Sequence, residues 1–126
     1  MDGKLKTLVG RAKNDSKVIA VLLFGSYARG EKNYNDIDIC LVLGKKYTNK
    51  EMTNKRIEFL RNMSGNMDIH VFQQLPIYIR KRILKDCKVI FCKDDKLLYE
   101  IAFSTIKEFE FYEKLYKMYL KSVKNG

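Results

Sequence analysis

With 126 residues, the chain has room for one compact core, and its 46% of hydrophobic residues and scarce glycine and proline are typical of a folded protein. No run approaches the roughly 18 apolar residues of a membrane span, and the N-terminus lacks the apolar segment of a signal peptide, so we expect no membrane contact and a cytoplasmic location. The formal net charge of +10 favours nucleotides, nucleic acid or an acidic protein as partners. The lysines are spread along the chain, however, which fits an ordinary solvated surface equally well and argues against nucleic acid as the main partner.

The cysteines lack a C-x-x-C spacing and predict neither a disulfide framework nor a zinc site: Cys40, Cys87 and Cys92.

The first part of the chain predicts a helix, a strand, a turn and a second strand. Apolar residues at helical spacing after a cap at Asp2 predict a short first helix: Leu5, Leu8, Val9 and Ala12. The continuous apolar run 18–24 predicts a strand that is buried on both faces and ends at Gly25. The polar segment 26–35 leaves space for a tight turn and about one turn of helix. Residues 36–43 predict a second strand, which begins at a pair of aspartates.

The second part alternates helices and strands and ends in a long helix. A helix is predicted over 49–63 from the spacing of its apolar residues: Met52, Ile57, Leu60 and Met63. A third strand is predicted over 67–72, and Pro76 opens a further helix at its first turn. A short strand is predicted over 88–92, and a long helix over 94–123. These elements predict one mixed α/β (α+β) domain.

The long C-terminal helix carries two adjoining apolar stripes. One stripe alternates spacings of four and three residues: Leu98, Ala102, Thr105, Phe109, Tyr112, Tyr116, Tyr119 and Val123. The other stripe contains Leu97, Ile101, Phe111, Leu115 and Met118. The simpler interpretation is that one stripe packs on the sheet and the other on the preceding helix. The alternative is an exposed aromatic surface that binds a partner or forms a homodimer.

The most informative polar residues are aspartates at the starts of two predicted strands. Asp36 and Asp38 are two residues apart on one strand, so both carboxylates project to one face, while Ile37 projects to the other. Carboxylates held so close repel each other, and a hard cation such as Mg²⁺ relieves the repulsion. Asp68 begins another apolar strand and is the natural third ligand, although taken alone it would fit an exposed carboxylate at a strand end.

The segment before the aspartates predicts a phosphate-binding turn. Gly25 follows a buried strand and lets the backbone approach a ligand closely. The hydroxyl of Ser26 and the N–H groups of a beginning helix can bind phosphate oxygens. The segment matches neither a Walker loop nor a dinucleotide-binding G-x-G-x-x-G loop. Arg29 and Lys32 either contact phosphates from the same turn or are solvated surface charges.

Gly25-Ser26 followed by Asp36-Ile37-Asp38 resembles the signature of the DNA polymerase β nucleotidyltransferase superfamily. Gly-Ser-x-Ala-Arg-Gly followed by Asn-Asp-Ile-Asp-Ile is similar to its minimal nucleotidyltransferase (MNT) group, and the resemblance covers about residues 18–72. Asn35 stands where MNT sequences often have serine. The resemblance implies a nucleotidyltransferase fold, a small mixed sheet flanked by helices, here within one domain over 1–126 that has a helical part at about 94–124.

The resemblance also implies roles for particular residues. Gly25, Ser26 and Arg29 would contact the nucleotide. Asp36, Asp38 and Asp68 would be the catalytic carboxylates and would bind the metal, two Mg²⁺ ions with Mn²⁺ as the alternative. ATP would be the substrate, and Asp68 would hold the second ion or accept the proton of the attacking hydroxyl. His70 shares the face of Asp68, but a lone strand histidine is more often packed and hydrogen-bonded.

MNT proteins are commonly paired with HEPN-domain toxins, and the resemblance therefore implies an antitoxin that transfers AMP from ATP to a tyrosine of a HEPN partner. Two other hypotheses remain open. One is transfer to a small hydroxylated molecule, although a chain of this length lacks the extra substrate domain of such enzymes. The other is a non-catalytic module that only binds a partner, against which the presence of all three expected carboxylates argues.

Overall fold

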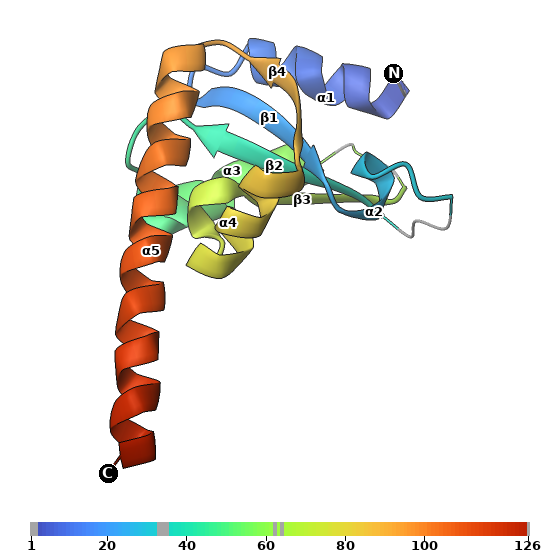
Figure 1. Ribbon diagram of the computed structural model, residues 1–126. Helices are drawn as coiled ribbons and strands as arrows, with labels where there is room; N and C mark the ends of the chain where they lie inside the picture. Colours follow the sequence, from blue (N-terminus) through green and yellow to red (C-terminus); the bar gives the residue numbers. More distant parts are fainter. Residues whose placement is uncertain (1–2, 33–35, 62, 64, 126) are drawn as a thin grey trace.

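The computed structural model describes residues 3–32, 36–61, 63 and 65–125, so the predicted cap at Asp2 and the family position Asn35 lie outside the described residues. Helices and strands alternate along the chain (Figure 1). The elements are α1 Gly3–Lys13, β1 Val18–Phe24, α2 Gly25–Ala28, β2 Ile37–Leu43, α3 Asn49–Leu60, β3 Met67–Val71, a 3-10 turn η1 Phe72–Gln74, α4 Ile77–Asp86, β4 Lys88–Cys92 and α5 Asp95–Asn125. The mixed α/β architecture with a long C-terminal helix is confirmed.

The strands form one mixed sheet in the order β3-β2-β1-β4. β1 and β2 are the two inner strands of this sheet. β1 is antiparallel to both β2 and β4, while β2 and β3 run parallel. A parallel pair needs a crossover connection, and α3 supplies it. The start of β2 therefore lies beside the start of β3, and the end of β1 adjoins the start of β2.

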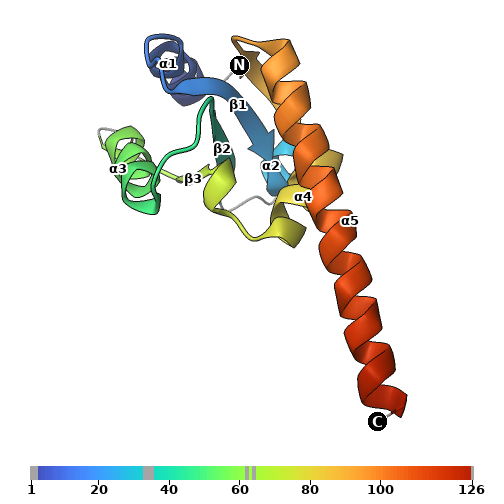
Figure 2. The ribbon, with the colours of Figure 1, turned by 90° about the vertical axis from the view of Figure 1, so that its left-hand side faces the viewer.

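Both faces of the sheet are covered, as the two ribbon views show (Figure 2). α1 and α3 pack on one face through a core that includes Leu8, Val21, Ile39, Phe59 and Ile69. α4 and the first part of α5 pack on the other face through Ala20, Leu22, Val42, Ile83 and Leu98. The near-continuous apolar sequence of β1 follows from this double burial, because both sets of its alternating side chains enter a core.

The helix α3 differs from the sequence prediction at its end and in its buried face. It begins at a capping box made by Thr48 and Glu51, but it ends at Leu60 rather than at residue 63. Phe59 is buried, whereas Ile57, one of the apolar residues whose spacing predicted the helix, is 45% exposed. Arg11 explains the orientation: its guanidinium lies 4.8 Å from the Phe59 ring centroid and donates hydrogen bonds to carbonyl oxygens of the last helical turn.

Two predicted strand boundaries also shift by one residue. β2 begins at Ile37, so Asp36 precedes the strand instead of opening it. β3 ends at Val71, and Phe72 starts the η1 turn, where its ring is buried on the α4 side of the sheet. The apolar character of Phe72 indicated burial correctly, but burial alone does not distinguish a strand from a 3-10 turn.

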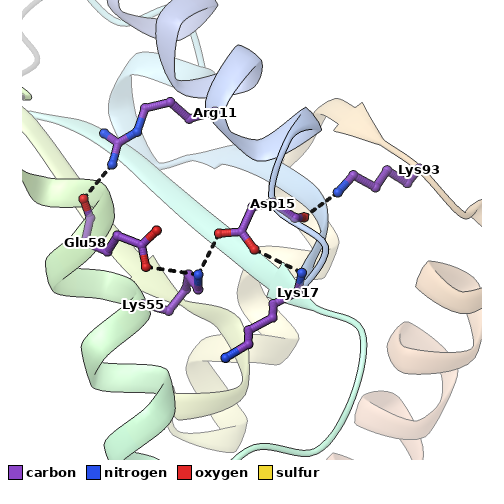
Figure 3. Close-up of polar contacts among 6 residues, drawn as sticks. All are labelled: Arg11, Asp15, Lys17, Lys55, Glu58 and Lys93. Carbon is purple, nitrogen blue, oxygen red and sulfur yellow. Dashed lines mark hydrogen bonds and ion pairs between the residues drawn. The ribbon is translucent and has the colours of Figure 1, made fainter.

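A polar network fastens the α1–β1 turn to α3 (Figure 3). Lys55 donates hydrogen bonds to Asp15 at 2.6 Å and to Glu58 at 3.0 Å. The Lys55 and Asp15 side chains are only 11% and 12% exposed. Lys93, which follows β4, donates to the backbone carbonyl of Asp15. The turn is therefore held by α3 and by the strand β4 at the end of the sheet where β1 begins.

The three cysteines are free thiols, one buried and two partly buried. Burial raises the pKa of Cys40, Cys87 and Cys92 above the ordinary thiol value. A raised pKa keeps a thiol protonated near neutral pH and makes it a poor nucleophile.

The long helix α5 is packed only along its first part. Leu97, Leu98 and Ile101 join the core on the α4 side of the sheet. The last contacts with the body are an ion pair of Arg80 with Glu108 at 3.1 Å and a Lys81–Phe109 cation–π contact at 5.2 Å. Every described residue from 110 to 125 is exposed, and the helix projects away from the sheet (Figure 1). The simpler interpretation of the two stripes, in which both are buried, is therefore wrong beyond Phe109.

No helix among the described residues has the length and apolar character needed to cross a membrane.

Candidate active site

Two of the predicted site carboxylates lie side by side on the sheet. Asp38 and Asp68 are register partners on the parallel strands β2 and β3. Paired residues of neighbouring strands project to the same face, and alternation places this pair on the α4 side of the sheet. Ile37 and Ile39 belong to the core on the opposite side, as the sequence predicts.

Gly25 brings the predicted phosphate-binding turn directly against Asp38. Phe24, the last residue of β1, is the register partner of Asp38, and the chain turns at once into α2. Gly25 has a φ of +77°, and a Cβ atom at this position would lie 2.2 Å from Oδ2 of Asp38. Only glycine avoids both the unfavourable backbone conformation and the clash. The turn and the carboxylate therefore form one site.

The electrostatics of Asp38 reflect the nearby carboxylates. Burial raises the pKa of Asp38 above its ordinary value, and the negative charges of Asp68 and Asp36 raise it further. His70 and Arg29 act in the opposite direction. The three aspartates thus repel one another across one small region, which is the condition under which a bound cation is stabilising.

Asp68 is held by two side chains. Its Oδ2 lies 3.0 Å from Nε2 of His70, and its Oδ1 lies 4.0 Å from a guanidinium nitrogen of Arg56. His70 also contacts Phe24, with ring centroids 6.2 Å apart, and Arg56 donates a hydrogen bond to the Ile69 carbonyl at 2.6 Å. His70 is half-buried and packed against Phe24, in line with the interpretation preferred from sequence, and its polar contact is with the Asp68 carboxylate.

No sequence pattern indicated that Arg56 would lie at the site. It is one of several basic residues on α3, and nothing in its spacing indicates that α3 crosses β3 beside Asp68. His70 was identified from sequence because it lies two residues after Asp68 on the same strand, and therefore on the same face of the sheet.

The remaining predicted site residues lie around this pair. Asp36 is exposed and precedes β2, and Ser26 is the second residue of α2, partly buried. Arg29 is exposed, and its Nε is 2.6 Å from a carboxylate oxygen of Glu31. Lys32 is exposed as well. Arg29 is therefore already paired with an acid, so a phosphate would have to compete with Glu31 for it.

No group of three His, Cys, Asp or Glu side chains within the described ranges is gathered as a metal site. Asp68 is turned toward His70, and Asp36 stands outside the strand. The donor set nevertheless fits a hard divalent cation, because it consists of carboxylates, and burial together with the neighbouring negative charges raises the pKa of Asp38. Rotation of the Asp68 side chain away from His70 would add its oxygens to those of Asp38.

A cavity of about 240 Å³ adjoins the glycine turn. It is lined by Phe24, Gly25, Arg29, Ile79, Arg82, Ile83 and Asp86. A larger cavity of about 530 Å³ lies at the other end of β2, beside Leu43 and Phe72, and none of the predicted site residues lines it. The larger cavity is remote from the carboxylates. The smaller cavity is therefore the better candidate for part of a nucleotide.

Two sequence comparisons relate the chain to known proteins. Residues 6–96 match the family described as "Polymerase beta, Nucleotidyltransferase". The chain is 43% identical over 77 residues to a protein of Methanocaldococcus jannaschii named "Putative protein adenylyltransferase MJ1547". That match spans 60% of this chain and 57% of the relative, so it covers little more than half of the relative's length.

Solved structures share the fold. One is a toxin–antitoxin with AMP-PNP, with a TM-score of 0.69, 18% identity and 95% of each chain covered. Another is a tri-AMPylated Shewanella oneidensis HEPN toxin in complex with an MNT antitoxin, with a TM-score of 0.65, 17% identity, and coverage of 95% of this chain and 92% of the other. The glycine turn, the paired aspartates and the match over 6–96 lead to one conclusion: this chain belongs to the polymerase β-type nucleotidyltransferase family.

Proposed function

We propose that this protein transfers AMP from ATP to a hydroxyl group, specifically a tyrosine hydroxyl of a HEPN-domain partner. The observation that carries the proposal is the register pairing of Asp38 with Asp68 beside the Gly25 turn. A relative named as an adenylyltransferase supports the reaction, and solved toxin–antitoxin structures of the same fold support the partner.

The carboxylates would hold the metal. Asp38 and Asp68, joined by Asp36, would bind Mg²⁺, with two ions expected. The bound metal would neutralise the phosphate charge while the acceptor hydroxyl attacks the α-phosphorus in line. Among the chain's own residues, Asp68 would accept the proton of the attacking hydroxyl. His70 and Arg56 would keep its carboxylate oriented until substrate binds.

The glycine turn would hold the triphosphate. Gly25 allows the phosphates to approach the backbone, and Ser26 offers a hydroxyl and an N–H group at the start of α2. The adjoining cavity has Arg82 on its α4 side, where a guanidinium can bind phosphate oxygens. Arg29 would give up its ion pair with Glu31 and bind the nucleotide instead. These residues bind and position ATP, so that its α-phosphorus lies near the aspartates.

The direct test of acceptor and partner uses α-labelled ATP, Mg²⁺ and a lysate of the source organism. We expect a discrete labelled protein band, which mass spectrometry identifies together with its modified tyrosine. The Asp36→Asn, Asp38→Asn double variant should give no band. Asp95→Asn, an exposed aspartate in the first turn of α5, is the matched control and should label as the wild type does.

Three results would overturn the proposal in different ways. A band that persists in the double variant would show that the label comes from another enzyme of the lysate. Labelling of a small molecule without any protein band would support nucleotidyl transfer but would contradict a protein acceptor. Absence of both labelling and ATP binding would leave only a non-catalytic partner-binding module.

A further inference from the structure

The cavity of about 240 Å³ beside the glycine turn lies between one face of α4 and the end of β1. The pairing of β1 with β4 brings the last turn of α4 to this end of the sheet. β4 begins at Lys88, two residues after Asp86, and Lys88 is the register partner of Leu23. Asp86 therefore lies near the point where β1 turns at Gly25, and both residues line the same cavity.

Two opposite charges stand on the α4 side of this cavity. Arg82 and Asp86 are exposed and four residues apart on one helix face, yet neither is in an ion pair within the described part of the chain. Asp86 is also the last residue of α4. A carboxylate is unfavourable there, because the C-terminal end of a helix carries partial negative charge. Among the described residues, the fold thus supplies no ion pair that stabilises this carboxylate.

The lining of the cavity restricts the ligand that it can hold. Phe24 and Ile83 provide an apolar surface, while Arg29 and Arg82 can donate hydrogen bonds to phosphate oxygens. Asp86 would repel a phosphate and requires a hydrogen-bond donor instead. In ATP the donors belong to the nucleoside, as the ribose hydroxyls and the amino group of the base. The cavity is smaller than the roughly 300–1,000 Å³ of complete small-molecule sites, so it would take one part of the nucleotide.

We propose that Asp86 binds the ribose hydroxyls of ATP and so makes this protein select ribonucleotides over deoxyribonucleotides. The inference rests on the proposed function, because it requires that the Gly25 turn holds the phosphates. The ribose is bonded directly to the α-phosphate, whereas the amino group lies at the far side of the base. A carboxylate that shares a small cavity with the phosphate-binding turn is therefore better placed for the ribose. An acidic residue binds the ribose 2′-hydroxyl in dinucleotide-binding folds by the same hydrogen-bond chemistry.

Isothermal titration calorimetry with ATP and with 2′,3′-dideoxy-ATP tests the inference, in the presence of Mg²⁺ and without an acceptor. The wild type should bind ATP about tenfold more tightly, because the dideoxy nucleotide lacks the hydrogen bonds to a charged group. Asp86→Ala should reduce the ratio of the two Kd values to about one. The ratio is the decisive quantity, since loss of a negative charge affects the phosphates of both nucleotides equally.

Two control variants and a third nucleotide make the test specific. Asp95→Ala removes an exposed aspartate at the start of α5, outside the cavity lining, and should leave the ratio at about ten. Asp86→Ala should melt no lower than the wild type, because it removes a carboxylate from a helix C-terminus. Inosine triphosphate has an oxygen in place of the adenine amino group, and Asp86→Ala should weaken its binding as much as that of ATP.

The contrary results are distinguishable from failure of the proposed function. Equal binding of ATP and dideoxy-ATP by the wild type, or a ratio that survives Asp86→Ala, would overturn the ribose role and leave nucleotidyl transfer intact. Weaker binding of ATP but not of inosine triphosphate would assign Asp86 to the base and contradict the proposal. A wild type that binds none of the nucleotides would overturn the proposed function and this inference with it.

Discussion

At the scale of single residues, Gly25 and Asp38 depend on each other. The glycine occupies a left-handed backbone conformation, and its hydrogen atoms leave the space that the Asp38 carboxylate fills. The sequence predicted both residues as members of one site, since glycine at a strand end and aspartates on the next strand are recognisable patterns. It could not predict their contact, which arises from the pairing of Phe24 with Asp38 across the hairpin.

Gly25→Ala and Gly30→Ala should separate the two effects of glycine. Both positions have positive φ, at +77° and +76°, so each alanine costs about 1 kcal/mol of stability. Only at Gly25 would the new methyl group meet Asp38, whereas Gly30 has open space. We expect Gly25→Ala to lower kcat/KM by at least about 100-fold through displacement of the carboxylate, and Gly30→Ala to change it little. Steady-state kinetics and thermal melting measure both, and equal activity losses would contradict the account.

Asp38→Asn should abolish activity yet stabilise the metal-free protein. The pKa of Asp38 is raised by folding, so its ionisation costs stability as pH rises above the ordinary value of 3.8. Without divalent ions, the variant should therefore melt higher than the wild type at pH 7, and the difference should disappear at pH 3.8 and below. Transfer should fall more than about 1000-fold, because the metal contributes several kcal/mol. A variant that is less stable than the wild type at pH 7 would mean that burial and the neighbouring carboxylates do not destabilise the charged form of Asp38.

At the scale of elements, apolar periodicity predicted which segments are helices and strands. The bounds of β1 and β4 match the predicted runs 18–24 and 88–92, because an apolar run flanked by polar residues has only one strand register. The buried face of α3 was not predictable in the same way. Phe59 rather than Ile57 is buried because Arg11, distant in sequence, stacks on its ring.

The Lys55–Asp15 contact that joins α3 to the α1–β1 turn should be important for stability. Burial alone would lower the pKa of Lys55, but its hydrogen bonds to Asp15 and Glu58 offset this and raise it. The contact therefore stabilises the fold at neutral pH, and the contribution of the Lys55 charge is lost as pH rises through its raised pKa.

Lys55→Met should lower the free energy of unfolding by about 1–3 kcal/mol, because it leaves the nearly buried Asp15 carboxylate without its partner. Chemical denaturation at pH 7 measures the change. Lys50→Met, an exposed lysine on the same helix, is the control and should have little effect. Equal stability of the two variants would show that the network in Figure 3 contributes nothing.

At the scale of the whole molecule, α2 lies at the end of the sheet away from α5 (Figure 1), although Asp38 and Asp68 project to the face of the sheet that α4 and α5 cover. The stripes of α5 predicted a buried or partner-binding helix, but a periodic pattern cannot tell whether the covering surface belongs to the same chain. Likewise, the sequence predicted Asp38 and Asp68 on strand starts, and only the sheet order made them neighbours.

The central claim is that this molecule transfers a nucleotidyl group, and parallel reactions with α-labelled and γ-labelled ATP test it most directly. With Mg²⁺, the acceptor should carry label from α-labelled ATP only, the γ-label should appear in pyrophosphate, and EDTA or Asp38→Asn should stop both. Acceptor labelled from γ-labelled ATP would reveal phosphoryl transfer instead and would contradict the account.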